Sequence, residues 1–194
     1  MWKKLNRKLT MAARIGHLDA VRRLLIEGAN PNGTDKHGLT ALMLAAASGQ
    51  SEVAKVLLDA GANPNQTEKF GGTALMMTAG FFGNAEVAKV LLARIANPNQ
   101  ADKFGGTALS CAAESANTEV VKLLLSAGAN PNASDSRGYT ALDMANSGLK
   151  RTKLAQNPYS ASYYEWTETT FLESPEKAEE YREIIRLLKE AVAK

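Results

Sequence analysis

Short apolar stretches and turn residues alternate along this chain, and the alternation returns after about 33 residues. The tetrapeptide Ala-Asn-Pro-Asn occurs four times at intervals of 33, 34 and 33 residues, and its first asparagine is Asn30, Asn63, Asn97 or Asn130. The tripeptide Thr-Ala-Leu keeps the same intervals and begins at Thr40, Thr73, Thr107 and Thr140. Because two separate motifs share one period, the pattern indicates a repeat protein.

Each repeat predicts two short helices that stack on those of its neighbours. In the unit around residues 38–61, Thr40 can cap the first helix through its hydroxyl, and Gly49 ends that helix. Residues 52–58 predict a second helix, and Gly61 suits the left-handed conformation just after it. The proline of Asn-Pro-Asn favours extended backbone, and the turn residues that follow favour a hairpin between units. Neither helix can bury its apolar face alone, so the units must share one continuous core.

These motifs resemble the ankyrin-repeat family over nearly the whole chain. Residues 38–46, Gly-Leu-Thr-Ala-Leu-Met-Leu-Ala-Ala, stand where the family has Gly-x-Thr-Pro-Leu-His-x-Ala-Ala, and residues 52–61 match its second helix. The resemblance implies an all-α repeat solenoid of ankyrin-like helix-turn-helix units joined by short β-hairpin fingers. Ile95 stands where other units have glycine, so we expect that turn to be strained or differently shaped. The family's histidine is replaced here by Met43, Met76, Ser110 and Asp143.

Five units account for the chain as a single domain, residues 1–194. Their approximate bounds are 5–35, 36–68, 69–102, 103–135 and 136–194. The fifth unit is interrupted, because its second-helix motif follows that of the fourth unit after 64 residues instead of 33. We place this insertion at about 149–174 and predict a closing helix from about 175 to 192. We expect the equivalent leucines of units two to five to be buried: Leu42, Leu75, Leu109 and Leu142.

Composition excludes several classes of protein. The single cysteine, Cys111, cannot form an intramolecular disulfide, and with only two histidines it cannot complete a four-ligand structural zinc site. No apolar run approaches the roughly 18 to 20 residues that cross a bilayer, and the N-terminus lacks the apolar stretch of a secretory signal. We therefore expect a cytoplasmic protein, although a mature secreted or periplasmic form without its leader is compatible with the same sequence.

The charge distribution gives little support to a nucleic-acid partner. The net charge is only +3, with +5 in residues 1–27 and −5 in residues 159–183. The basic start has no long cationic run and few aromatic residues, so we interpret it as a solvated N-terminal cap. We expect no nucleic acid among the partners.

No set of residues suited to catalysis is visible. A hydrolase or transferase needs a nucleophile, a base and an orienting group, and the two histidines and the cysteine stand at positions that indicate structural or solvated roles. The paired glycines at 71–72 and 105–106 belong to turns between units, so phosphate binding there is a poor interpretation. We expect no catalytic residue, no bound metal and no cofactor.

Aromatic residues at turns are the feature that points to a binding surface. Phe70 and Phe104 stand at finger tips, where they either contact a partner or pack on the adjacent finger. Phe81 and Phe82 stand at the turn between the helices of unit three. The insertion is rich in aromatic residues: Tyr159, Tyr163, Tyr164, Trp166 and Phe171. We expect it to fold back over the last units, the alternative being a disordered loop that awaits a partner.

The resemblance implies a non-catalytic protein–protein interaction module, a scaffold or adaptor that binds a protein on its concave finger and inner-helix surface. The candidate contact residues are His37, Leu39, Met43, Phe70, Met76, Phe81, Phe82, Phe104, Arg137, Tyr139 and Trp166. An alternative is an accessory or regulatory protein whose aromatic insertion occludes or forms the binding site. A remote alternative is an enzyme with a site in the insertion, although residues 149–174 contain no His or Cys. We expect a monomer without a membrane span.

Overall fold

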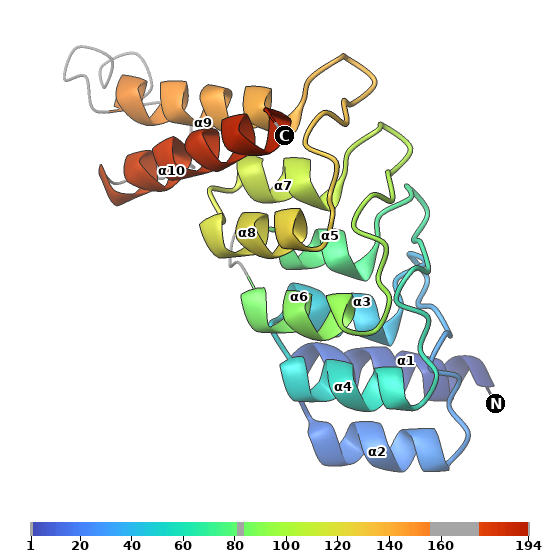
Figure 1. The fold of residues 1–194 in the computed structure, drawn as a ribbon. Coiled ribbons are helices and arrows are strands. Elements are labelled where there is room, and N and C mark those ends of the chain that lie inside the picture. Colours follow the sequence, from blue (N-terminus) through green and yellow to red (C-terminus); the bar gives the residue numbers. More distant parts are fainter. Residues whose placement is uncertain (1, 81–83, 156–174, 194) are drawn as a thin grey trace, which may run out of the picture.

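The computed structural model describes residues 2–80, 84–155 and 175–193, and these residues form ten helices (Figure 1). The helices are α1 (Trp2–Ile15), α2 (Leu18–Ile26), α3 (Ala41–Ala47), α4 (Ser51–Asp59), α5 (Ala74–Thr78), α6 (Ala85–Leu92), α7 (Ala108–Glu114), α8 (Thr118–Ser126), α9 (Ala141–Ala155) and α10 (Pro175–Val192). The described residues contain no β-sheet, and the fold is an all-α repeat solenoid.

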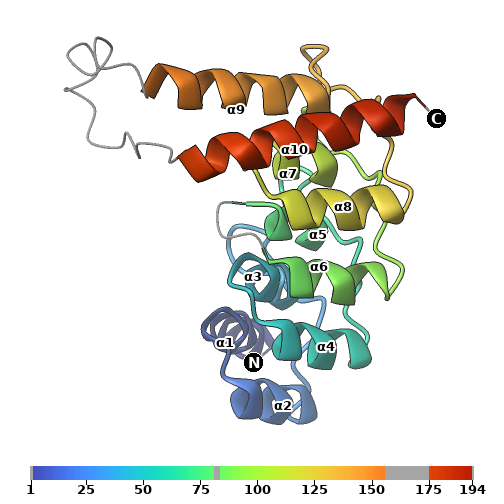
Figure 2. The ribbon, with the colours of Figure 1, turned by 60° about the vertical axis from the view of Figure 1, so that its left-hand side comes forward.

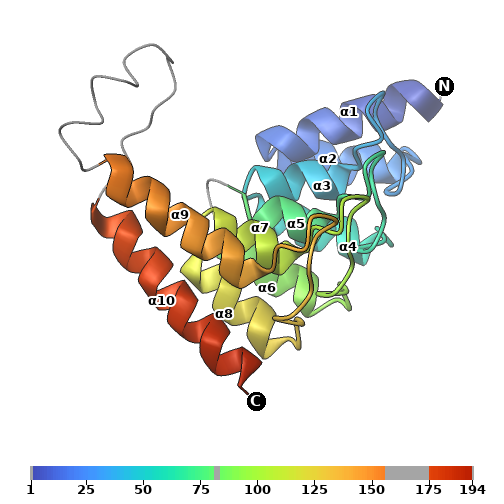
Figure 3. The ribbon, with the colours of Figure 1, turned by 90° about the horizontal axis from the view of Figure 1, so that it is seen from above.

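The helices form two layers that run along the stack. The inner layer contains α1, α3, α5, α7 and α9, each in contact with the next, and the outer layer contains α2, α4, α6, α8 and α10 in the same way. Figure 3 looks down the stack and shows the loops between units gathered along one side of the inner layer. The repeat therefore places equivalent loop residues in a row.

The inner helices begin at capping threonines, as the sequence predicts. The hydroxyl of Thr40 accepts a hydrogen bond from the N–H of Met43 at 3.1 Å, and Thr73 caps α5 in the same way. In the fourth unit the cap is reciprocal, because Thr107 accepts from the N–H of Ser110 while the Ser110 hydroxyl oxygen accepts from the N–H of Thr107 at 2.9 Å. These bonds satisfy amide groups that a helix start would otherwise leave unpaired.

Four loops, which we call fingers 1 to 4, connect the units at residues 34–40, 67–73, 101–107 and 134–140. A single antiparallel bridge joins the two ends of fingers 1, 3 and 4. The turns use glycines with positive φ, such as Gly38 at 84° and Gly105 at 82°. Where the sequence predicts β-hairpins, three fingers thus have a single bridge and finger 2 has none.

The repeated Asn-Pro-Asn segments are joined by a ladder of side-chain hydrogen bonds. The Oδ1 atom of Asn32 accepts from the backbone N–H of Asn63 at 2.7 Å, and its Nδ2 atom donates to the carbonyl of Gly61 at 3.0 Å. Asn65 and Asn99 repeat both bonds toward the units that follow them. One asparagine per unit therefore satisfies backbone groups of the next unit at the end of its outer helix.

The predicted core leucines are buried in units two to four but only partly in unit five. Leu42, Leu75 and Leu109 are each 1% exposed, whereas Leu142 is partly buried at the edge of the core. Leu142 lies on α9, and no further inner helix stacks on α9 among the described residues. The expectation of four equivalent buried leucines is therefore wrong for Leu142.

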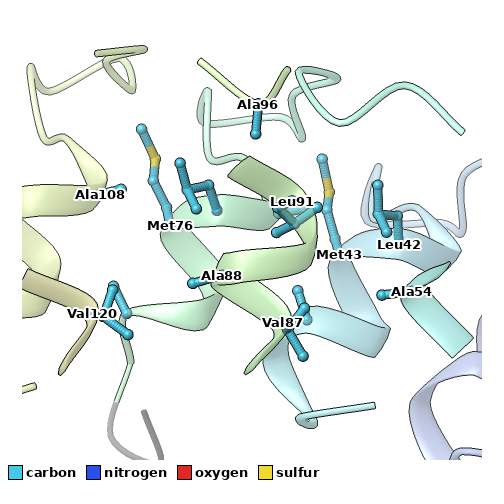
Figure 4. Close-up of a cluster of buried hydrophobic side chains, with 14 of the residues drawn as sticks. Leu42, Met43, Ala54, Met76, Val87, Ala88, Leu91, Ala96, Ala108 and Val120 are labelled. Carbon is cyan, nitrogen blue, oxygen red and sulfur yellow. The ribbon is translucent and has the colours of Figure 1, made fainter. Parts of the chain in front are cut away.

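Two of the candidate contact residues, which we placed behind the finger tips, are buried in the core. Met43 is 1% exposed and Met76 is 8% exposed. Figure 4 shows both side chains within the cluster of buried apolar residues that also contains Leu42 and Leu91. The side chain of Met43 folds back over the start of α3, where its sulfur accepts from the N–H of Thr40 at 3.5 Å. This position keeps the Met43 side chain away from the finger and inner-helix surface.

The two longest C-terminal helices close the stack. Figure 2 shows α9 and α10 lying antiparallel across one end and extending beyond the shorter helices beneath them. Tyr181 of α10 is 1% exposed, and its hydroxyl donates to the carbonyl of Glu114 at 2.7 Å. Its ring lies against Gly148 of α9, where a methyl group would overlap ring atoms. This contact ties α10 to both α7 and α9.

The closing helix agrees with its prediction, since α10 runs from Pro175 to Val192. The first residues of the predicted insertion, 149–155, continue α9 beyond the length of the other inner helices. Residues 156–174 lie outside the described part of the chain. The prediction that the aromatic insertion folds back over the last units concerns these residues and therefore stays a prediction.

The turn at Ile95 is strained, as the sequence predicts. Ile95 has φ 64°, in the left-handed region, whereas its counterparts Gly28, Gly61 and Gly128 reach φ 81–89° without a side-chain penalty. The side chain of Ile95 is 86% exposed, so it gains little from packing.

We expect Ile95→Gly to raise the free energy of unfolding by about 1 kcal/mol, because it removes a left-handed β-branched residue and little packing is lost. Urea denaturation followed by circular dichroism measures the change. Gly61→Ala is the matched control, since a methyl group at Gly61 would meet no atom within 4 Å and only the backbone strain would change. This control should lose stability, and a loss from Ile95→Gly would contradict the explanation.

Candidate binding surface

The four fingers lie side by side along one edge of the inner helices (Figures 1 and 3). Backbone hydrogen bonds join fingers 2, 3 and 4: the N–H of Lys103 donates to the carbonyl of Phe70 at 2.9 Å, and the N–H of Ser136 donates to the carbonyl of Phe104 at 2.7 Å. Fingers 2, 3 and 4 are thus fixed to one another, and their tips form a continuous edge.

Each finger has one acidic residue whose carboxylate is turned into its own loop. In finger 1, Oδ1 of Asp35 accepts from the N–H groups of His37 and Leu39 at 2.8 and 3.0 Å. The equivalent pair of bonds is made in the other fingers by Glu68, Asp102 and Asp135. The negative charges therefore stabilise the turns, while the basic residues beside them project outward.

The two phenylalanines pack on each other and are still half exposed. The rings of Phe70 and Phe104 lie with their centroids 6.5 Å apart and their planes 24° apart. Phe70 is 54% exposed and Phe104 is 59% exposed. The ammonium group of Lys69 lies 5.7 Å from the Phe70 ring centroid. Each ring thus packs on the adjacent finger and still offers about half its surface outward, so the packing is observed and contact with a partner stays a prediction.

Finger 4 repeats the combination of a ring and a cation. Tyr139 is 47% exposed, and the guanidinium of Arg137 lies 5.2 Å from its ring centroid. Arg137 also pairs with Asp135 at 2.9 Å, and the exposed fraction of its side chain is 69% against 8% for Asp135. The pKa of Asp135 is lowered, chiefly because the N–H of Tyr139 donates to it and secondarily because of Arg137. The carboxylate stays ionised inside the loop, and the cation stands at the tip.

A cleft of about 820 Å³ lies between finger 1 and α1. His37, which is exposed, and Leu39, which is half-buried, line its finger side. Arg7, Met11 and Arg14 line the helix side. The sequence interpretation missed these three, because it treated the basic N-terminus as a solvated cap. Their spacing of four and three residues, which places them on one face of a helix, was the available signal.

The structure thus brings six of the eleven candidate residues to one surface: His37, Leu39, Phe70, Phe104, Arg137 and Tyr139. Met43 and Met76 lie beneath it in the core. Phe81, Phe82 and Trp166 lie outside the described residues.

The described residues show little that favours chemistry at this surface. Burial raises the pKa of the Cys111 thiol to about 11, with smaller contributions from Asp102 and Glu114, so it is almost entirely protonated near neutral pH. His17 caps α2, since its Nδ1 atom accepts from the N–H of Ala20 at 3.4 Å. Within the described ranges, no three or more His, Cys, Asp or Glu side chains gather as a metal site would require.

Comparison with known proteins follows the repeat pattern. The family model described as "Ankyrin repeats (3 copies)" matches residues 9–102 and 75–155. A search of curated proteins finds no match to this chain. Among the described helices, none combines the length and the apolar character that a membrane span requires.

Proposed function

The chain belongs to the ankyrin-repeat family, and from this premise we propose that it is a non-catalytic scaffold or adaptor that binds a protein partner on its concave finger and inner-helix surface. Ankyrin repeats are generally protein–protein interaction modules. The observation that carries the proposal is the row of half-exposed aromatic side chains with adjacent cations on fingers 2 to 4. Clustered aromatic and arginine side chains are the residues on which binding energy most often depends.

The contact residues have different roles in this proposal. Phe70, Phe104 and Tyr139 are the apolar anchors, since each keeps about half of its surface exposed on a rigid loop. Arg137 supplies a cation beside an anchor, and His37 and Leu39 extend the surface toward α1. Hydrogen bonds between the fingers hold the anchors in place, so binding loses little conformational entropy.

The same proposal includes the organisation that the sequence predicts. We treat residues 1–194 as one domain of five units, with an insertion in the fifth unit, and as a cytoplasmic monomer whose partners do not include nucleic acid. The continuous contacts from α1 to α10 support a single domain.

We expect the double variant Phe70→Ala, Phe104→Ala to weaken partner binding by about 1 kcal/mol or more while each single change shifts the free energy of unfolding by less than about 1 kcal/mol. The exposed rings contribute to the fold mainly through one stacked contact, whereas a partner would bury the remaining surface. Affinity capture from cell extract with wild-type and double-variant protein, quantified by mass spectrometry, tests the binding. Thermal melting tests the stability.

Ile26→Ala is the control for loss of an exposed apolar side chain elsewhere. Ile26 lies on the outer helix α2 and is 87% exposed. The Ile26→Ala variant should capture the same proteins as the wild type. A large fall in melting temperature from Phe70→Ala or Phe104→Ala would show that the rings are structural, and unchanged capture by the double variant would contradict the proposed surface.

A further inference from the structure

The cations of the inner surface differ from those of the outer helices in their pairing. On α4 and α6, Lys55 pairs with Glu52 and Lys89 pairs with Glu86, in both cases at 2.6 Å. On the inner surface, five cations form no ion pair with any described residue: Arg7, Arg14, Lys36, Lys69 and Lys103. Several cations of the outer helices are therefore neutralised by an ion pair within their own helix, whereas these five cations of the inner surface form none with a described residue.

The cleft between finger 1 and α1 concentrates these charges. Arg7, Arg14 and Lys36 line it, and Asp35 is the acidic residue in its lining. Oδ1 of Asp35 is already engaged by two N–H groups of finger 1. The guanidinium of Arg14 contacts the sulfur of Met11 at 3.4 Å rather than a carboxylate. The cleft consequently favours an anionic group.

The lining of the cleft also includes apolar side chains, which we call its apolar base. Met11, Leu39 and Leu44 contribute to its lining, and Met11 is 47% exposed. Finger 1 lies directly beside finger 2, because a methyl group added at Gly38 would stand 3.4 Å from the N atom of Lys69. Cationic and apolar side chains continue along the finger row: the ammonium group of Lys69 lies 5.7 Å from the Phe70 ring centroid, and the exposed Lys103 precedes the exposed Phe104 in finger 3.

We propose, on the basis of the function proposed above, that this surface binds an extended acidic segment of a partner protein in which carboxylate side chains alternate with apolar ones. Carboxylates would pair with Arg7, Arg14 and Lys36, and apolar side chains would occupy the Met11 and Leu39 base and the phenylalanine edge. An extended chain places successive side chains on opposite sides, so such a sequence can present both kinds of group to a narrow strip.

A polypeptide fits this surface better than a nucleic acid does. Single-stranded nucleic acid requires a cationic track for its phosphates together with aromatic platforms on which separate bases stack. Here the aromatic platforms Phe70 and Phe104 are stacked on each other, and the strongest group of cations surrounds an apolar base. Apolar side chains gain from that base, whereas phosphates do not.

The test uses the full chain and a fluorescein-labelled peptide of about twelve residues in which Glu alternates with Leu or Phe. Fluorescence anisotropy should show binding at least about tenfold tighter than for the same peptide with Lys in place of Glu, and weaker binding as salt rises from about 50 to about 500 mM. Equal binding of the two peptides, or no binding of the acidic one, would overturn the proposal.

Two charge-reversal variants locate the site. The double variant Arg14→Glu, Lys36→Glu should weaken binding of the acidic peptide by at least about tenfold, because it reverses the charge of two cations in the cleft. Arg22→Glu with Arg23→Glu is the matched control, since it makes the same change in net charge at exposed positions of α2. Both variants should keep the wild-type melting temperature within a few degrees. Equal loss of peptide binding in both variants would show a non-specific charge effect and overturn the proposal.

A single-stranded oligonucleotide of about twelve nucleotides is the competing probe. Suppose that the oligonucleotide binds as tightly as the acidic peptide and that the double variant Arg14→Glu, Lys36→Glu loses this binding. The assignment of the surface to an acidic polypeptide would then be wrong. The proposed function fails separately: it fails if capture of the natural partner survives Phe70→Ala with Phe104→Ala, whatever the synthetic peptide does.

Discussion

Replacing Leu75 or Leu109 with alanine is expected to lower the free energy of unfolding by about 2 to 5 kcal/mol, the largest loss that we predict for a single core position. Both side chains are 1% exposed and belong to the continuous cluster of buried apolar residues. Truncation removes apolar contacts and leaves a cavity that the neighbouring units can only partly fill. Because stability in a repeat protein depends on contacts between neighbouring units, a loss in the middle of the stack weakens both interfaces of the altered unit.

Leu142→Ala is the matched control for this prediction. Leu142 occupies the equivalent place in the fifth unit but is only partly buried, so its loss should be clearly smaller. Urea denaturation monitored by circular dichroism measures all three variants. Equal losses at Leu75 and Leu142 would show that burial in the stack does not determine the cost.

Gly148→Ala is expected to lower the free energy of unfolding by about 2 to 4 kcal/mol, although the same change in an ordinary helix interior stabilises by about 1 kcal/mol. A methyl group at Gly148 would overlap the ring of Tyr181. The ring has little room to move, because it is buried and its hydroxyl donates to the carbonyl of Glu114 at 2.7 Å. Either α10 shifts away from α9 or the hydrogen bond is lost.

A double-mutant cycle tests this explanation. In the background of Tyr181→Leu, the change Gly148→Ala should cost much less, because the ring that it meets is gone. Ser147→Ala, at an exposed position of the same helix, should change the stability by less than about 0.5 kcal/mol. Additive losses for Gly148→Ala and Tyr181→Leu would show that the two residues do not determine each other's packing.

The sequence by itself determined the local structure, because the signals involved lie within a few residues of one another. Thr40, Thr73 and Thr107 cap helices through hydrogen bonds to residues three positions ahead. The left-handed conformation of Gly61 depends only on the absence of a side chain at that residue. The period of 33 residues required stacking, since neither helix of a unit buries its apolar face alone. The closing helix and the strain at Ile95 were predictable for the same local reason.

Tertiary structure alone decided which of these residues face outward and which distant groups meet. Met43 was a candidate contact residue behind the finger tips, and its side chain folds back over the start of its helix and is covered by the stack. Leu142 matches its counterparts in sequence and differs because, among the described helices, no further inner helix stacks on α9. Burial depends on what packs against a residue, and the residue's own repeat does not contain that information.

Contacts between units could not be predicted from the sequence for a related reason. The asparagine ladder joins residues about 30 positions apart and begins at Asn6, which accepts from the N–H of Asn30 at 3.1 Å although it stands outside any Asn-Pro-Asn motif. The cleft of the inner surface likewise forms only when finger 1 folds against α1 and brings Lys36 to Arg7 and Arg14. Pattern specified the repeating unit, and the stacking of units created the cleft and the row of fingers, because both are built from groups that come together only when the chain is folded.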